Sequence, residues 1–206
     1  MNQLKERDKS KKRTAILKGA EDVFIQYGYE LASMDSIAET AGVSKRTVYN
    51  HFGSKENLFE VIVDELLAER QTLKTIQYDS NRSLQEQLAA FAESEIYLID
   101  SPRRLELSRF LTITFLKDLE FQRKTVSKYP PVYNMFFEWL KEAQKDGAIQ
   151  TDDIVTTARV FYALVIGAIT WPALFTEGIN KQTIKPMLDE IIDVFLSKYG
   201  ASGESS

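Results

Sequence analysis

The sequence predicts an all-α fold, and three observations point to it. Apolar residues recur every three or four positions along most of the chain, which is helical spacing, and few segments alternate as strands do. Serines precede several of the apolar runs, where a hydroxyl can accept a free first-turn N–H. Glycines or prolines end the runs. We expect about nine helices: three short ones at the N-terminus and about six longer ones after them.

The three short helices make an N-terminal head. An amphipathic helix over residues 11–27 ends at Gly28, and Ser33 caps a second helix. Gly42 then supplies a tight turn, and Ser44 opens the third helix. A short helix, a turn that contains glycine and a second short helix are typical of a helix-turn-helix.

Cations follow the cap residues of two successive helices. Lys45 and Arg46 come directly after Ser44, and Lys55 comes directly after Ser54. The positive end of a helix dipole favours Asp or Glu at this place, by up to about 1 kcal/mol. A bound anion would explain both starts, because helix N–H groups and cations converge well on a phosphate. The alternative is two solvated helix starts that carry this small cost.

The third helix has a distinct outward face. At about 100° per residue, Val48 and Phe52 share the inward face. The opposite and flanking positions hold Arg46, Asn50, Thr47 and Tyr49. These side chains suit base edges and phosphates, whereas a merely solvated face more often carries Glu–Lys pairs.

The rest of the chain predicts a larger helical body. The expected helices cover residues 54–73, 83–100, 102–116, the segment that Gly147 ends, 152–176 and 183–199. Ser83 and Glu86 form a capping box after the loop at 78–83. We assign residues 1–55 to the head (ordered from about 11), 56–200 to the body and 201–206 to a disordered tail.

Composition excludes most enzyme classes. The chain of 206 residues has no cysteine and one histidine, so thiolate zinc sites, histidine clusters and Cys–His pairs are excluded. No GxSxG elbow accompanies His51. We therefore expect no catalytic residues, no metal and no cofactor.

Charge and hydropathy indicate a cytoplasmic protein without a membrane segment. The N-terminal MNQLKERDKSKKR lacks the apolar core of a secretory signal. The longest uncharged run, residues 160–175, is shorter than the roughly 20 residues that span a bilayer. Residues 1–55 carry +3 of a total charge of −4, and a basic head on an acidic body suits a polyanionic partner.

The segment SMDSIAETAGVSKRTVYNHFGSKENLFEVIV resembles the DNA-binding head of the TetR/AcrR family of bacterial transcriptional regulators. The matching positions are Ile37, Ala38, Ala41, Gly42, Val43, Ser44, Tyr49, His51, Phe52, Ser54, Lys55, Glu56, Leu58 and Phe59. The resemblance covers about residues 11–65. The chain departs from the family pattern at Ala32, where threonine is common, and at Arg46, where glycine is common.

The resemblance implies two kinds of DNA contact. Phosphate contacts would come from Ser33, Ser44, Thr47, Tyr49, His51 and Lys55. Groove-edge contacts would come from Lys45, Arg46 and Asn50. For His51, packing beside Phe52 is an equal alternative. The basic run at residues 5–13 could reach DNA, but the interleaved acids Glu6 and Asp8 favour a solvated tail.

The body has an aromatic surplus and no motif. Most of these rings at helical spacing are ordinary core, but a pocket between helices would be lined by some of them. The candidates for ligand binding are Phe91, Phe110, Thr114, Phe115, Tyr133, Phe137, Tyr162 and Trp171. The uncharged run favours a bulky apolar or aromatic effector over a strongly charged one.

We therefore expect an effector-responsive transcriptional regulator. By resemblance it would be a repressor that binds a palindromic operator in double-stranded DNA and is released by a small molecule. It would form a homodimer through its last two helices, about 152–176 and 183–199. The alternative is a helical ligand-binding or protein-interaction module whose head does not bind operator DNA.

Overall fold

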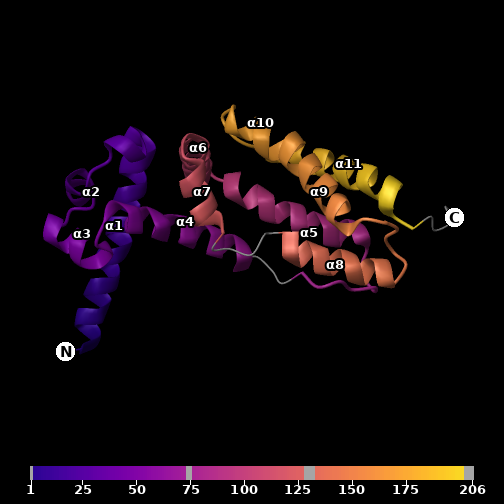
Figure 1. Ribbon diagram of the computed structural model, residues 1–206, viewed down its shortest axis with the longest axis horizontal. Helices are drawn as coiled ribbons and strands as arrows, with labels where there is room; N and C mark the ends of the chain where they lie inside the picture. The colour runs from indigo at the N-terminus through magenta and orange to yellow at the C-terminus, as the bar shows by residue number, and fades with distance from the viewer. Residues whose placement is uncertain (1, 73–75, 128–132, 202–206) are drawn as a thin grey trace. The chain divides into compact units, whose positions relative to one another are not determined.

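The computed structural model describes residues 2–72, 76–127 and 133–201, which form helices joined by loops (Figure 1). Within those ranges the only β pairing is a single bridge between Ile149 and Gly200. The predicted all-α class is confirmed. The chain packs as two compact units, which we call the first unit (residues 1–68 and 106–125) and the second unit (residues 69–105 and 126–206).

The first unit holds the three N-terminal helices and parts of three others. Its helices are α1 (Asn2–Leu31), α2 (Met34–Thr40), α3 (Lys45–Phe52), most of α4 (Lys55–Thr72), most of α6 (Pro102–Lys117) and most of α7 (Leu119–Val126). The predicted division at residues 55 and 56 separates α4 from the head. In the structure, α4, α6 and α7 instead pack with the head, because their apolar faces share one core with α1.

Helix α1 begins well before residue 11, where order was expected to start. An ion pair between Lys12 and Asp8, with 2.7 Å between Nζ and Oδ2, is one i, i+4 contact that supports the added turns. The helix breaks at Gly28, as predicted, where φ is +77° and a Cβ would be strained. The acids that indicated a solvated tail therefore lie in a helix.

Helices α2 and α3 form the predicted helix-turn-helix. The Ser33 hydroxyl accepts a hydrogen bond from the Ser36 amide at 3.1 Å, and the Ser44 hydroxyl accepts one from the Thr47 amide at 3.2 Å. Gly19 of α1 brings α2 close, because a Cβ there would lie 2.9 Å from the backbone nitrogen of Ala41. Helices α1 and α2 therefore pack closely at Gly19.

An aromatic cluster forms the core of the first unit. The rings of Phe24 and Phe110 stack with centroids 5.6 Å apart, and Phe59 meets both edge-on. Tyr29 and Phe121 pack against Phe59 at 5.2 and 5.1 Å. The cluster joins α1, α4, α6 and α7, which fixes the positions of these four helices relative to one another.

The second unit is a helical body around its own core. Its remaining helices are α5 (Leu84–Ile96), the 3-10 turn η1 (Tyr97–Ile99), α8 (Tyr133–Lys145), α9 (Ile154–Val165), the π-helical turn η2 (Ile166–Thr170), α10 (Trp171–Leu174) and α11 (Lys181–Tyr199). Its fully buried aromatic side chains are Phe91, Phe136, Trp139, Phe161, Tyr162 and Phe195. Of the predicted tail at 201–206, Ala201 donates a backbone hydrogen bond to the carbonyl of Ala148 at 3.0 Å, and residues 202–206 lie outside the described residues.

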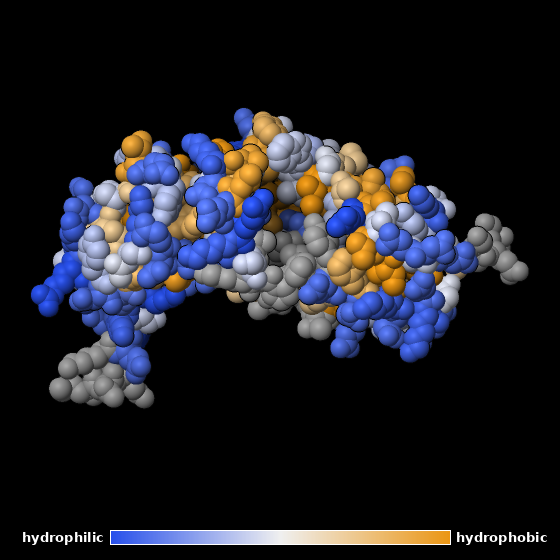
Figure 2. All heavy atoms as spheres, in the orientation of Figure 1, coloured by the Kyte–Doolittle hydropathy of each residue, from blue (hydrophilic) through white to orange (hydrophobic). Residues whose placement is uncertain are grey.

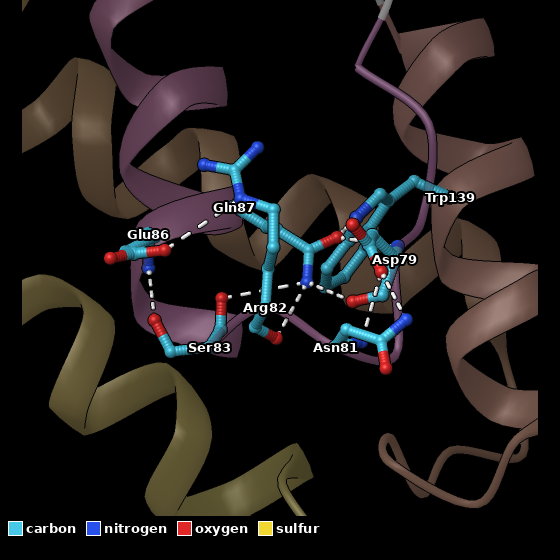
Figure 3. Close-up of polar contacts among 7 residues, drawn as sticks. All are labelled: Asp79, Asn81, Arg82, Ser83, Glu86, Gln87 and Trp139. Atoms are coloured by element: carbon cyan, nitrogen blue, oxygen red, sulfur yellow. Dashed lines mark hydrogen bonds and ion pairs between the residues drawn. The ribbon is translucent and has the colours of Figure 1, made fainter.

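A buried glutamine ties the loop before α5 to α8 (Figure 3). Gln87 donates to the carbonyl oxygens of Asp79, Arg82 and Ser83, and its own oxygen accepts from the Asp79 amide and the Trp139 indole N–H. The amide is 1% exposed and uses all of its hydrogen-bonding capacity. The loop therefore has a fixed conformation.

The predicted capping box at the start of α5 forms only in part. The Ser83 hydroxyl accepts from the Glu86 amide at 3.2 Å, as expected. The Glu86 carboxylate, however, lies 3.7 Å from Nε of Arg82, one turn away. An opposite charge at i, i+4 is available to Glu86, and this pairing replaces the reciprocal bond to the cap amide.

The apolar segment from Ile154 to Leu174 contains a π turn instead of one uniform helix. The Trp171 amide donates to the carbonyl oxygen of Ile166, five residues back, directly before Pro172. By length and composition alone this segment of 21 residues could cross a membrane. No membrane segment was expected, because only the uncharged residues 160–175 had been counted. About a third of its most apolar window is buried in the second unit.

Candidate nucleic-acid interface

Helix α3 divides into a buried and an exposed face, as its sequence predicts. Val48 and Phe52 are buried against the head, while Arg46, Tyr49 and Asn50 are exposed. Over the described ranges, no hydrogen bond or ion pair holds the side chain of Arg46 or Asn50. These two residues are four apart and share one face, so both can reach the same groove edge.

The hydroxyl groups at the helix starts have a donor left over. The Ser44 and Thr47 hydroxyl oxygens lie 2.8 Å apart, so one hydroxyl hydrogen is shared between them and the other stays available. The Ser33 hydroxyl lies 3.0 Å from that of Ser36, whose own hydrogen is donated to the Ser33 carbonyl at 2.8 Å, so a phosphate would accept the Ser33 hydrogen in place of Ser36. A phosphate oxygen could accept from each pair while the caps remain intact.

Lys45 has a partner within the protein that the sequence did not indicate. Its ammonium lies 2.8 Å from a carboxylate oxygen of Asp35 in α2, and both side chains are more than half exposed. The hydrogen bond to Asp35 raises the pKa of Lys45 above its ordinary value. Asp35 therefore offsets part of the positive charge at the start of α3.

Lys55 is held by the end of α1. Its ammonium donates to the carbonyl oxygens of Tyr29 at 2.8 Å, Ala32 at 3.1 Å and Glu30 at 3.4 Å. It also lies 4.5 Å from the centroid of the Tyr29 ring. Because an ammonium has three N–H donors, these carbonyls use all of them. Of the three cations that suggested an anion at the helix starts, Lys45 and Lys55 thus have protein partners.

His51 lies beside a basic part of α1. Burial lowers the pKa of His51 from its ordinary value of 6.5, and the nearby cations Lys9, Arg13 and Lys12 lower it further. The ring of this half-buried side chain is also 6.1 Å from that of Phe52, so His51 lies between its packing neighbour and the basic part of α1. Lys9 and Arg13 are four residues apart in the sequence, and this helical spacing could have indicated a basic face on α1.

The predicted ligand-binding residues are divided between the two units. In the first unit, Phe110 and Thr114 line a cavity, and Phe115 is half-buried beside Phe121. In the second unit, Phe91 and Tyr162 lie in the core, Phe137 packs against it and Trp171 is about half exposed. The side chain of Tyr133 lies outside the described residues. The eight residues do not line one pocket within either unit.

Family models match both parts of the chain. Residues 16–62 match the model of bacterial regulatory proteins of the tetR family. Residues 86–201, more than half of the chain, match the C-terminal domain of AefR-like transcriptional repressors.

Individual proteins agree with these models. A TetR family transcriptional regulator from Pseudomonas syringae pv. tomato, of known crystal structure, is 30% identical, with 91% of this chain and 96% of that chain covered and a TM-score of 0.73. The regulator YhgD of Bacillus subtilis is 26% identical over 86% of this chain and 93% of its own. The transcriptional activator FasR of Mycolicibacterium smegmatis is 39% identical, but over only 40% of each chain.

Proposed function

Because the chain belongs to the TetR family of bacterial transcriptional regulators, which are not enzymes, we propose that it represses transcription by binding a palindromic operator as a homodimer. A small apolar or aromatic ligand would release it. The observation that carries the proposal is the exposed face of α3, where Arg46 and Asn50 have no protein partner within the described ranges. The sign of regulation rests on the repressor model that matches residues 86–201.

The homodimer would form through α9 to α11. Figure 2 shows apolar side chains, in orange, at the surface over these helices. The large exposed ones are Val155, Trp171, Phe175, Met187 and Val194. Large apolar side chains exposed on neighbouring helices mark an interface more often than a solvated face does. A two-fold dimer would present two copies of α3 to successive major grooves.

Operator binding is tested by selection from random duplex DNA. The full chain should enrich a pseudo-palindromic sequence whose half-sites lie about one helical turn apart, ~34–36 Å, or a multiple of it. Enrichment of single half-sites, or of no sequence, would contradict a symmetric dimer on DNA. We also infer a cytoplasmic location and no membrane partner, because the proposed DNA target lies in the cytoplasm.

A second candidate function follows from Lys45 and Lys55. Both cations have partners inside the first unit, as expected for a head that does not bind DNA. In that case the chain would be a ligand-binding or protein-interaction module. The two candidates separate in the selection experiment, because such a module would enrich no DNA and would still bind its ligand.

Release by a ligand bound in the second unit would require a link between the units, and α4 is the candidate. It starts at Lys55 in the first unit and passes into the second at residue 69. A ligand that favours one arrangement of α4 would change DNA affinity with a coupling of about 1–3 kcal/mol. Coupling is reciprocal, so saturating operator should weaken ligand binding by the same factor. Equal ligand affinity with and without operator, by calorimetry, would exclude this link.

A further inference from the structure

A cavity of about 760 Å³ opens in the first unit between the C-terminal part of α1 and helices α6 and α7. Its volume is within the usual range for sites that bind small molecules, ~300–1,000 Å³. The inner wall is aromatic and rigid, because Phe24, Phe110 and Phe121 all belong to the cluster that forms the core of this unit. An aromatic ring of a ligand could pack on these rings without moving them.

The rim of this cavity exposes large apolar side chains. Leu31 is 80% exposed, Ile113 55% and Tyr27 51%, and all three line the opening. In Figure 2, orange side chains reach the surface at the C-terminal end of α1. Single exposed apolar residues are ordinary, but three around one cavity form a surface that binding would bury. The rim therefore points to an occupant with an apolar body.

The charges around the cavity select the sign of that occupant. The lining carboxylates are Glu30, Glu56, Glu106 and Asp118, and the lining cations are Arg109 and Lys117. Lys55 lies nearby against the Tyr29 ring without lining the cavity, and counting it still leaves an excess of one carboxylate. The excess negative charge would repel an anionic ligand, whereas a cation would be attracted by both the carboxylates and the aromatic faces.

One of these carboxylates is held in its ionised form. Hydrogen bonds from its own backbone amide and from the Ser54 hydroxyl lower the pKa of Glu56 below its ordinary value. The Tyr29 hydroxyl also bonds to Glu56, and burial raises the pKa of Tyr29 to about 12, so this phenol stays neutral. At neutral pH this side of the cavity therefore carries a negative charge beside an aromatic ring.

We propose that this cavity binds a small organic cation, with its apolar body against Phe110 and Phe121 and its charge beside the rim carboxylates. This refines the effector of the proposed function and places it in the first unit, next to α1. A neutral apolar ligand and a second copy of the chain are the competing occupants. Binding of either competing occupant would not depend on the rim carboxylates, whereas binding of a cation would.

Two probe ions of equal size and opposite charge test the proposal. Tetraphenylphosphonium and tetraphenylborate have the same shape, so binding of the first to the full chain should be at least tenfold tighter by calorimetry. Glu106→Gln should weaken phosphonium binding severalfold and narrow the difference between the ions, with the thermal midpoint unchanged because Glu106 is exposed. Ile113→Ala should weaken both ions, since it removes part of the apolar rim.

A matched variant controls for a second acidic groove. Glu93 lies in a groove of about 640 Å³ between α5 and α11 in the second unit, so Glu93→Gln should leave phosphonium binding unchanged. Equal affinity for the two ions, no binding of the phosphonium, or loss in Glu93→Gln but not in Glu106→Gln would each overturn the proposal. Operator binding is measured separately, so its failure would end the proposed function and leave the cavity result intact.

Discussion

The ammonium of Lys55, at the start of α4, donates to the backbone carbonyl of Tyr29, at the end of α1, at 2.8 Å and lies over the ring of the same residue. A cation at this place stabilises free carbonyls and the negative end of the helix dipole. The contact joins the helix that precedes the helix-turn-helix to the helix that follows it. We therefore assign Lys55 a role in holding the head together.

Lys55→Ala should lower the free energy of unfolding by about 1–3 kcal/mol, because it removes charge-assisted hydrogen bonds. Urea denaturation measures this. Lys45→Ala is the matched control, and because its pair with Asp35 is exposed, this variant should unfold at nearly the same urea midpoint as the wild type. Unchanged stability together with a salt slope of DNA binding reduced by about 1 would instead identify Lys55 as a phosphate contact.

Arg46→Ala should relax the sequence preference at particular base pairs, because each paired base edge that it reads is worth about 1–3 kcal/mol of discrimination. Binding to a panel of single-base operator variants measures it. Arg46→Lys is the sharper comparison, since it keeps the charge and removes the planar fork of donors. It should relax the preference as alanine does and keep the salt slope of the wild type. A preference that survives both changes would remove Arg46 from the base-reading set.

DNA affinity should rise as the pH falls from about 7.5 to 6 if His51 contacts a phosphate. In the protein without DNA, burial and nearby cations lower the pKa of His51, so this side chain is mostly neutral near pH 7. A phosphate would raise the pKa of His51, so that DNA binding takes up a proton. His51 is the only histidine, and His51→Gln should flatten the profile. Identical profiles for the two proteins would favour packing beside Phe52.

The same pKa shift has an opposite effect on folding. Because the folded pKa of His51 lies below the ordinary 6.5, the unfolded chain binds this proton first. The His51 contribution to stability is therefore present above about pH 6.5 and is lost as the pH falls below it. Tighter DNA binding and lower stability should appear together in acid, and both should be reduced in His51→Gln.

Gln87→Met should destabilise the chain by about 3 kcal/mol or more, because it leaves the Trp139 indole N–H, the Asp79 amide and the Arg82 carbonyl without their partner. Gln85→Met, at an exposed position of the same helix, is the control and should change stability by less than about 0.5 kcal/mol. Equal midpoints in urea for the two variants would show that water replaces the missing amide.

Val194→Lys should shift the protein from dimer to monomer. Val194 is 48% exposed on α11, and Met187, two turns earlier, is 45% exposed on the same side. A lysine there would bring two like charges across a two-fold axis. Leu119→Lys, at an exposed apolar position of α7, is the control and should leave the mass unchanged in sedimentation. A Val194→Lys dimer as stable as the wild type would place the interface elsewhere.

Local features of the fold could be predicted from the sequence because their partners are near in the chain. Ser33 and Ser44 cap helices through amides three residues away, and Gly28 ends a helix through its own φ angle. The division of α3 into two faces follows from the helical period alone. Such features depend on a few neighbouring residues, so composition and spacing are sufficient to identify them.

Other features depend on packing between distant segments. The partner of Lys55 lies 26 residues earlier, and nothing at position 55 indicates that its charge meets carbonyls rather than phosphates. The helix at 102–116 was assigned to the body and no helix was predicted at the position of α7. Helical spacing does not specify which helix covers an apolar face, so the place of α6 and α7 beside α1 was missed. The cavity that they form could not be predicted for the same reason.

The first unit is built from two separate segments of the chain, and this has a consequence for biosynthesis. Residues 1–68 leave the ribosome before residues 106–125, which supply Phe110 and Phe121 to the aromatic cluster. At roughly 5–20 residues per second, the nascent head waits on the order of seconds with Phe24 and Phe59 lacking these neighbours. During that interval the head is open to chaperones and to other nascent chains. Translation speed across residues 69–125 therefore sets how long this vulnerable stage lasts.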